Sequence, residues 1–294
     1  MIKIEKIDLL IVLTPSGLHY DHVSKGLKNN INVLVEKPIT LKINEAKKLI
    51  NLSKKNKLYF GVMFQNRYNK SIQFLKKAID QNKLKKIICS NVNLIWSRYQ
   101  SYYQDDWHGK WKMDGGVLSQ QLIHHVDAMR YLLGDIKKVC AFSSNVINKL
   151  EAEDTISSLV IYKKGFTGTI NGTTAYRPND IEASLKIIAS NAYIEIGGIA
   201  LNKIINFNIN GKGISTKTKK MNSERVLSGY GNSHKVCLDY IFKHLKRKKF
   251  YKEKFLDPNQ ALETLKIVSS LYRSSEDGNV INLGKNTYSQ KLGL

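Results

Sequence analysis

The chain has 294 residues, of which 42% are hydrophobic and 24% are charged. This length and composition argue against a disordered chain and suit one large domain or two smaller ones. The formal net charge is +23, from 47 Lys and Arg against 24 Asp and Glu. Such a charge suits nucleic acid, an anionic membrane or a phosphorylated ligand, and composition alone does not choose among them.

Most of the lysines stand singly or in pairs among asparagines and isoleucines, and only residues 243–249 approach a basic cluster. We therefore favour an ordinary solvated surface over a nucleic-acid site. The three cysteines match neither a CxxC motif nor a zinc-ligand spacing, and their odd number argues against a disulfide framework. No apolar stretch approaches the roughly 20 residues that span a bilayer, and the first six residues lack the apolar core of a signal peptide. The sequence predicts a soluble, cytoplasmic protein with no membrane partner.

The first 64 residues alternate apolar runs with helical patterns. Continuous apolar runs are typical of strands that are buried on both faces of a parallel sheet. The expected order is strand 9–13, helix 19–28, strand 32–35, helix 43–56 and strand 58–64. This order predicts a doubly wound α/β sheet, with ligand-binding loops at the carboxyl ends of its strands: 14–17, 36–39 and 65–68.

After residue 69 the pattern changes to successive strands without intervening helices. Alternating apolar and polar residues predict strands over 87–96, 156–162, 167–176, 183–189 and 193–196. Helices are expected near 72–81 and over 118–133, 233–245 and 258–274, while 211–221 is expected to be a polar loop. We therefore expect a second, α+β domain with a largely antiparallel sheet over 69–294, after a first domain over 1–68.

The predicted helix 118–133 carries a polar stripe. It follows Gly115-Gly116 and ends at Gly134, a common C-terminal cap, and Gln120, His124 and Asp127 share one face because they are spaced i, i+4 and i+7. A site explains this stripe, but a core histidine paired with Asp127 explains it about as well. A metal site is less favoured because no third ligand is suggested nearby.

Lys37 is the other candidate for chemistry. It lies between a predicted strand end and Pro38, where a doubly wound sheet binds its ligands. A partly desolvated position there would lower the pKa of its ammonium group. The alternative is an ordinary exposed lysine.

Four motifs in order along the chain carry a family resemblance. They are Thr14-Pro15 with His19, then Glu36-Lys37-Pro38, then Gln65-Asn66-Arg67-Tyr68, and finally Gly115-Gly116 followed by His124 and Asp127. Together they resemble the Gfo/Idh/MocA oxidoreductases. The resemblance implies a Rossmann domain that binds NAD or NADP, then an open-faced sheet domain with flanking helices that contacts the substrate and favours homo-oligomers.

The resemblance also implies roles for individual residues. Lys37 and His124 match the catalytic pair of the family. Gln120 stands where many members have aspartate, and an amide cannot exchange protons as a carboxyl group can. Cofactor contacts are implied for Thr14, Pro15, Ser16, His19, Glu36, Lys37, Asn66 and Arg67, and substrate contacts for Lys37, Arg98, Trp107, Gln120, Gln121, His124 and Asp127.

A narrower similarity concerns the substrate. The segment 107–118, Gln121 and the run 177–180 resemble oxidases of UDP-N-acetylglucosaminuronate, which act at the sugar C3 hydroxyl in making surface polysaccharides. The implied reaction is hydride transfer from a ring carbon to nicotinamide, with His124 taking the hydroxyl proton and Lys37 polarising the oxygen. The aromatic loop 99–111, with Tyr102 and Tyr103, is a candidate lid or sugar-stacking surface, although core packing or an oligomer contact explains it equally.

The family's domain begins with a strand and a G-x-G-x-x-G turn that holds the pyrophosphate. Nothing before Ile7 supplies this element, so the resemblance predicts a truncated Rossmann-like sheet that lacks roughly 60 residues. A gene fragment or misplaced start is favoured over a genuine truncation or a separate completing polypeptide. The functional alternatives are a non-catalytic sugar-nucleotide binder or scaffold and, from its charge alone, a nucleic-acid binder.

Overall fold

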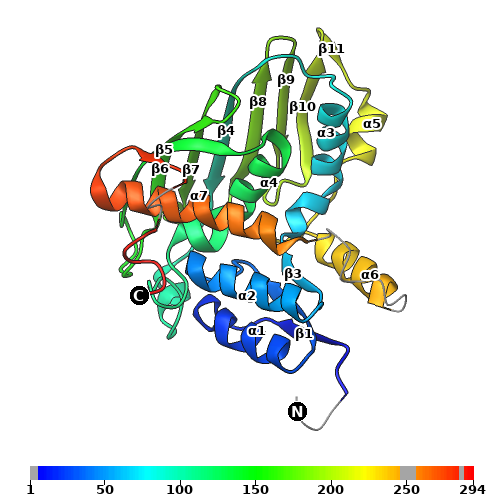
Figure 1. The fold of residues 1–294 in the computed structure, drawn as a ribbon. Helices are drawn as coiled ribbons and strands as arrows, with labels where there is room; N and C mark the ends of the chain where they lie inside the picture. Colours follow the sequence, from blue (N-terminus) through cyan, green and yellow to red (C-terminus); the bar gives the residue numbers. More distant parts are fainter. Residues whose placement is uncertain (1–5, 246–255, 285–287) are drawn as a thin grey trace.

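The described part of the chain contains two β-sheets that are covered by helices (Figure 1). A computed structural model describes residues 6–245, 256–284 and 288–294. The first sheet has three parallel strands in the order β1-β2-β3. Its elements are β1 (Leu9–Val12), η1 (Ser16–Leu18), α1 (His19–Lys28), β2 (Asn32–Glu36), α2 (Ile43–Lys55), β3 (Phe60–Met63) and η2 (Gln65–Tyr68). The predicted strand-helix alternation is therefore confirmed.

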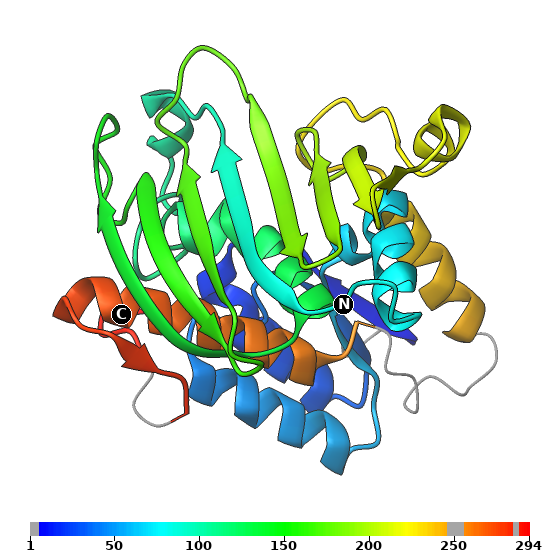
Figure 2. The same ribbon diagram turned by 90° about the horizontal axis from the view of Figure 1, so that it is seen from above.

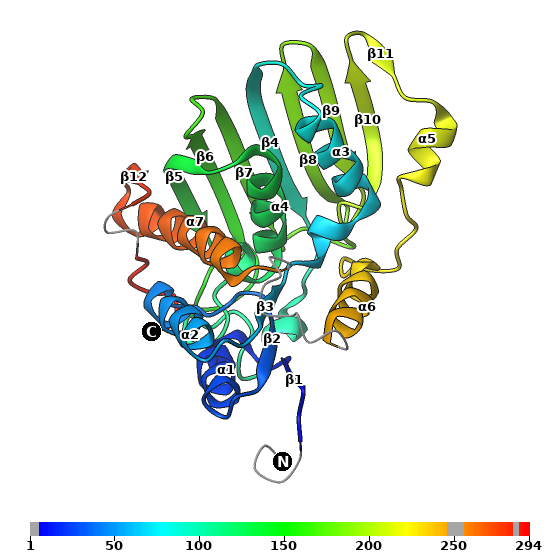
Figure 3. The same cartoon turned by 45° about the vertical axis from the view of Figure 1, so that its right-hand side comes forward.

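Burial explains why the central strand of this sheet is continuously apolar. Val33, Leu34 and Val35 are all fully buried, because helices cover both faces. Helices α1 and α2 lie on one face, and α6 (Ser233–Leu245), which comes from the far end of the sequence, lies on the other (Figure 3). There Cys237 and Ile241 pack against Leu34 in a second small core.

The second sheet has nine strands in the order β11-β10-β9-β8-β4-β7-β6-β5-β12. All neighbours are antiparallel except β4 and β7, so the prediction of a largely antiparallel sheet is confirmed. The strands are β4 (Ile87–Ile95), β5 (Ile136–Ser144), β6 (Thr155–Tyr162), β7 (Thr167–Thr173), β8 (Glu182–Ala189), β9 (Ala192–Gly197), β10 (Lys203–Ile209), β11 (Lys212–Gly213) and β12 (Ile281–Asn282).

Helices cover one face of this large sheet and leave the other open (Figure 2). The covering elements are α3 (Lys70–Asp80), the π-turn η4 (Leu118–Leu122), α4 (Ile123–Leu133) and α7 (Pro258–Asp277); η3 (Gln100–Tyr103) and α5 (Thr216–Met221) lie in connections. On the open face Phe142 is 67% and Leu159 62% exposed. In β6 buried and exposed residues alternate strictly, as expected for a sheet covered on one side.

Several elements differ from the sequence-based expectation. The helix expected over 118–133 begins as a π-turn, which widens the backbone where Gln120 and Gln121 lie. Strands β5 and β10 were missed, and the expected loop 211–221 contains β11 and α5. Of the basic cluster 243–249, residues 246–249 lie outside the described residues. Among the helices that are described, none is long and apolar enough to cross a membrane.

Asn69 ties the first sheet to the second. It follows η2, is 1% exposed, and its amide nitrogen donates to the carbonyl oxygen of Ala200 at 2.7 Å. Its amide oxygen accepts from the hydroxyl of Ser233 at 2.7 Å, at the start of α6. One buried side chain thus joins the segment between the two sheets, the β9–β10 connection and α6.

We expect Asn69→Ala to lower the free energy of unfolding by about 2–4 kcal/mol, because two buried polar partners lose their hydrogen bonds. Urea denaturation measures this change. The control is Asn29→Ala, whose side chain donates to Lys25 at the exposed end of α1, and it should change stability little. Equal losses in the two variants would contradict the role given to Asn69.

Candidate active site

A cavity of about 400 Å³ opens where the two sheets meet, at the carboxyl ends of β1, β2 and β3. The loop after β1 contributes Thr14 and Ser16, the end of β2 contributes Glu36 and Lys37, and the η4–α4 helix contributes Gln120, Gln121 and His124. Parallel strands present their carboxyl ends at one edge, which is why these loops converge.

Lys37 lies in the wall of this cavity. Its ammonium nitrogen donates to the backbone oxygen of Gln120 and to its side-chain amide oxygen, each at 2.5 Å. Burial lowers the pKa of Lys37, while the negative charges of Asp114 and Glu36 oppose this shift. The alternative of an ordinary exposed lysine is therefore wrong.

His124, on α4, lines the cavity. Among the described residues its Nδ1 is buried without a hydrogen-bond partner, and its ring meets the edge of Phe64 with centroids 6.0 Å apart. Burial holds the pKa of His124 well below its usual value, and the charge of Lys37 lowers it further. The imidazole is therefore neutral near pH 7 and can accept a proton.

Asp114 is a buried carboxyl group near this pair that the sequence analysis did not single out. Burial raises its pKa to about 8, and the positive charge of Lys37 works against that rise. Two groups with shifted pKa values that influence each other are typical of functional sites.

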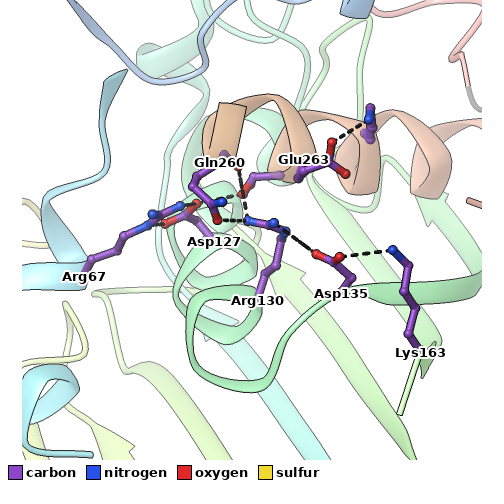
Figure 4. Close-up of polar contacts among 9 residues, drawn as sticks. Arg67, Asp127, Arg130, Asp135, Lys163, Gln260 and Glu263 are labelled. Carbon is purple, nitrogen blue, oxygen red and sulfur yellow. Dashed lines mark hydrogen bonds and ion pairs between the residues drawn. The ribbon is translucent and has the colours of Figure 1, made fainter. Parts of the chain in front are cut away.

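Asp127 does not pair with His124, so that alternative is wrong. Its carboxylate accepts from Arg67 through Nε at 2.5 Å and Nη2 at 2.6 Å (Figure 4). It also accepts from the hydroxyl of Thr264 at 2.7 Å. The side chains of Arg67 and Asp127 are 8% and 1% exposed, and neither lines the cavity. The structure thus gives the pair a bridging role between η2 and α4, where cofactor contacts for Arg67 and substrate contacts for Asp127 had been expected.

His19 links two of the loops that form the cavity. Its Nδ1 lies 2.7 Å from the carbonyl oxygen of Pro38 and its Nε2 lies 2.9 Å from that of Thr14, so it joins the loops after β1 and β2. It is 1% exposed and does not line the cavity. Pro15 and Asn66, two other expected cofactor contacts, are likewise absent from the lining.

The remaining predicted residues line the cavity, together with residues that the sequence analysis did not predict. Arg98 and Trp107 line the cavity as expected. Trp96 was missed, although it ends the strand predicted over 87–96 and lies two residues before Arg98. His234 was also missed; its Nε2 lies 3.4 Å from a carboxylate oxygen of Glu36, and no local pattern links residues so far apart in the sequence. In the described part of the chain, no group of three or more His, Cys, Asp or Glu residues is placed to hold a metal ion.

Comparison with known families gives two matches, which follow one another along the chain. The model described as an oxidoreductase family with an NAD-binding Rossmann fold matches residues 1–64, and the GFO/IDH/MocA C-terminal domain matches residues 72–195. The chain belongs to the Gfo/Idh/MocA oxidoreductase family. The match over residues 1–64 gives no support to the expectation that part of the first domain is missing.

Solved structures and curated relatives agree with this assignment. The WlbA dehydrogenase of Bordetella pertussis, in complex with NADH and UDP-GlcNAcA, has a TM-score of 0.89 at 29% identity, covering 97% of this chain and 82% of that one. The Chromobacterium violaceum WlbA dehydrogenase in the same type of complex has a TM-score of 0.88 at 28% identity, covering 97% and 80%. The Bacillus subtilis scyllo-inositol 2-dehydrogenase (NADP(+)) IolW is 30% identical over 150 residues, which is 51% of this chain and 40% of that protein. The match thus spans less than half of that curated relative.

We expect Arg67→Met to lower the free energy of unfolding by about 3–5 kcal/mol, because it leaves the buried Asp127 carboxylate without its cation. Thermal and urea denaturation measure the loss. As a control, Lys235→Met breaks an exposed i,i+4 pair with Asp239 and should change stability little. A small effect of Arg67→Met would show that the pair does not hold η2 to α4.

Proposed function

We propose that the chain is an NAD(P)-dependent dehydrogenase that oxidises a ring hydroxyl of a sugar. The observation that carries the proposal is the contact of Lys37 with Gln120 beside the neutral, unpaired His124, at the carboxyl ends of a parallel sheet. Membership of an oxidoreductase family supports it.

Lys37 and His124 would divide the work on the hydroxyl group. A lysine ammonium has three N–H donors, and Gln120 takes two of them. The third can polarise the substrate oxygen, while neutral His124 accepts the hydroxyl proton. When bound, the nicotinamide supplies the hydride acceptor, and the protein supplies orientation and electrostatics.

The residues present fit the nicotinamide end of the cofactor. Leu13, at the end of β1, is 70% exposed and lines the cavity, which offers an apolar surface to a flat ring. Gln65, after β3, also lines it, and its buried amide oxygen has no partner among the described residues, so it can accept from a carboxamide. The sequence contains no G-x-G-x-x-G motif for the pyrophosphate, and we propose no residues for that part.

For the substrate we propose a nucleotide-linked uronic acid oxidised at C3. The two WlbA dehydrogenases that were solved with NADH and UDP-GlcNAcA support this choice. The cavity volume lies in the range of small-molecule sites, and Trp96, Tyr102 and Trp107 offer rings beside the cations of Arg98 and Lys37.

We also propose a division into domains at residues 68 and 69, and homo-oligomers through the open sheet face, where Phe142 and Leu159 are exposed.

The alternative function is a non-catalytic sugar-nucleotide binder. It predicts that UDP-GlcNAcA binds in calorimetry while NADH fluorescence stays unchanged and no turnover is seen.

We expect Lys37→Met and His124→Asn each to reduce turnover of NAD(P)+ with UDP-GlcNAcA by about 100-fold or more, because each removes a group that acts on the hydroxyl. Spectrophotometric detection of the reduced cofactor measures this. Lys25→Met, on the exposed surface of α1, is the matched control and should retain full activity. Retained turnover in both site variants would refute the proposed roles.

The low pKa of His124 sets a pH dependence that can be measured without turnover. The neutral imidazole is the proton acceptor, so it remains competent until the pH falls below a pKa that lies under 6.5. Because the charge of Lys37 lowers this pKa, Lys37→Met should raise it. An NMR titration of the histidine rings measures both values. A pKa for His124 at or above 6.5 in the unaltered protein would contradict this account.

A further inference from the structure

The helix that carries Gln120 and His124 begins in a buried position, where its first backbone N–H groups have no acceptor within the helix. Glu153, just before β6, satisfies two of them. Its carbonyl oxygen accepts from the N–H of Val117 at 2.9 Å, and its carboxylate Oε1 accepts from the N–H of Leu118 at 2.9 Å. Glu153 is 2% exposed, so solvent does not compete for these donors.

Tyr272 of α7 satisfies the two neighbouring donors. Its hydroxyl oxygen accepts from the N–H of Gly116 at 3.1 Å and from that of Ser119 at 3.2 Å. The same hydroxyl donates to Oε1 of Glu153 at 2.8 Å, so the two side chains form one unit. Tyr272 is 1% exposed. Four consecutive backbone donors are thus held by two residues from distant segments.

Glu153 packs so closely against the backbone at Gly116 that no side chain fits there. A Cβ atom at this position would lie 2.1 Å from the carbonyl oxygen of Glu153 and 2.3 Å from its Oε2. Both distances are far below any van der Waals contact, so only glycine lets the carboxylate approach.

The backbone held by Glu153 and Tyr272 ends at Ser119, one residue before the glutamine that contacts Lys37. Gln120 follows Ser119 directly, and its backbone oxygen is the acceptor of the Lys37 ammonium at 2.5 Å. The π-turn Leu118–Leu122 widens the backbone here, a feature that often accompanies functional sites. A shift at residues 116–119 would therefore move the Gln120 carbonyl, and Lys37 with it.

We propose that Glu153 and Tyr272 are positioning residues that fix the Gln120 carbonyl, and through it the Lys37 ammonium, for the reaction. The proposal rests on the proposed function, because it assigns a purpose to the geometry of that same site.

Burying the carboxyl group of Glu153 is destabilising, which indicates a role beyond capping the helix. An exposed Ser, Thr, Asp or Asn at a helix start satisfies such donors without burying a charge. Here burial raises the pKa of Glu153 to about 7, and its Oε2 has no partner among the described residues. A buried carboxyl group with an unpaired oxygen is destabilising, and what this one provides is a fixed backbone beside the catalytic lysine.

The test compares Tyr272→Phe with Tyr162→Phe. Tyr162 is a matched control because it is also fully buried in the second domain and its hydroxyl bonds to one partner, Ser90, at 2.8 Å, away from the cavity. For Tyr272→Phe we expect kcat to fall by about 10- to 100-fold with the KM for UDP-GlcNAcA nearly unchanged. Tyr162→Phe should retain kcat.

Amide hydrogen exchange of the segment 116–122, followed by mass spectrometry, separates this inference from the proposed function. Exchange should be faster in Tyr272→Phe and unchanged in Tyr162→Phe, whether or not the protein turns over substrate. If the unaltered protein is inactive, the proposed function is refuted. The exchange result then still decides whether Glu153 and Tyr272 hold the backbone of residues 116–119 in place. An active protein in which both variants behave alike would overturn the inference.

A second pair of variants decides the matter if Tyr272→Phe does not fold. Glu153→Gln keeps an oxygen that can accept from Leu118 and Tyr272, so turnover should stay within about threefold of the unaltered protein. Glu153→Leu removes the acceptor and should lose at least about tenfold. Equal turnover in the two Glu153 variants would overturn the inference.

Discussion

The contact between Lys37 and Gln120 joins two parts of the chain that fold around separate sheets. The lysine lies at the end of β2, and the glutamine lies on the helix that covers the large sheet, yet the ammonium nitrogen is 2.5 Å from two oxygens of Gln120. The site therefore exists only while the two sheets hold their relative position. The Arg67–Asp127 pair and the side chain of Asn69 cross the same boundary and hold that position.

Burial gives the site its electrostatic character. It lowers the pKa of Lys37 and of His124 and raises that of Asp114. Lys37 is helped to keep its proton by the acidic groups of Asp114 and Glu36 and by the oxygens of Gln120. Burial keeps His124 neutral, and the charge of Lys37 adds to this effect. The amide of Gln120 holds the ammonium without neutralising it, which an aspartate at this position would do. One partly desolvated cation beside one neutral base follows from these few contacts.

The sequence predicted the parts of the fold whose signals are local. The buried runs before residue 64 predicted the parallel strands, and the position of Lys37 after one of them predicted its place at the cavity. The i, i+4 spacing of Gln120 and His124 also predicted their common direction. Helical spacing shows which side chains share a face but not how deeply each is buried. It therefore could not show that Asp127, on the same helix, lies buried against Arg67. Nor could it show the Glu153–Tyr272 unit, because its members are far apart in the sequence and meet only through the packing of α7. Strand β5 was missed because Lys137 and Lys138 follow its buried first residue, where an irregular register breaks the alternation of apolar and polar residues.

We propose that this cavity carries out direct hydride transfer to nicotinamide from C3 of a nucleotide-linked uronic acid. The most direct measurement supplies the full chain with NAD+ or NADP+ and a UDP-GlcNAcA that is deuterated at C3, and then locates the deuterium by mass spectrometry. The account predicts that deuterium appears on the nicotinamide ring of the reduced cofactor. Reduced cofactor without deuterium, or no reduced cofactor with this substrate or any other nucleotide sugar, would contradict it.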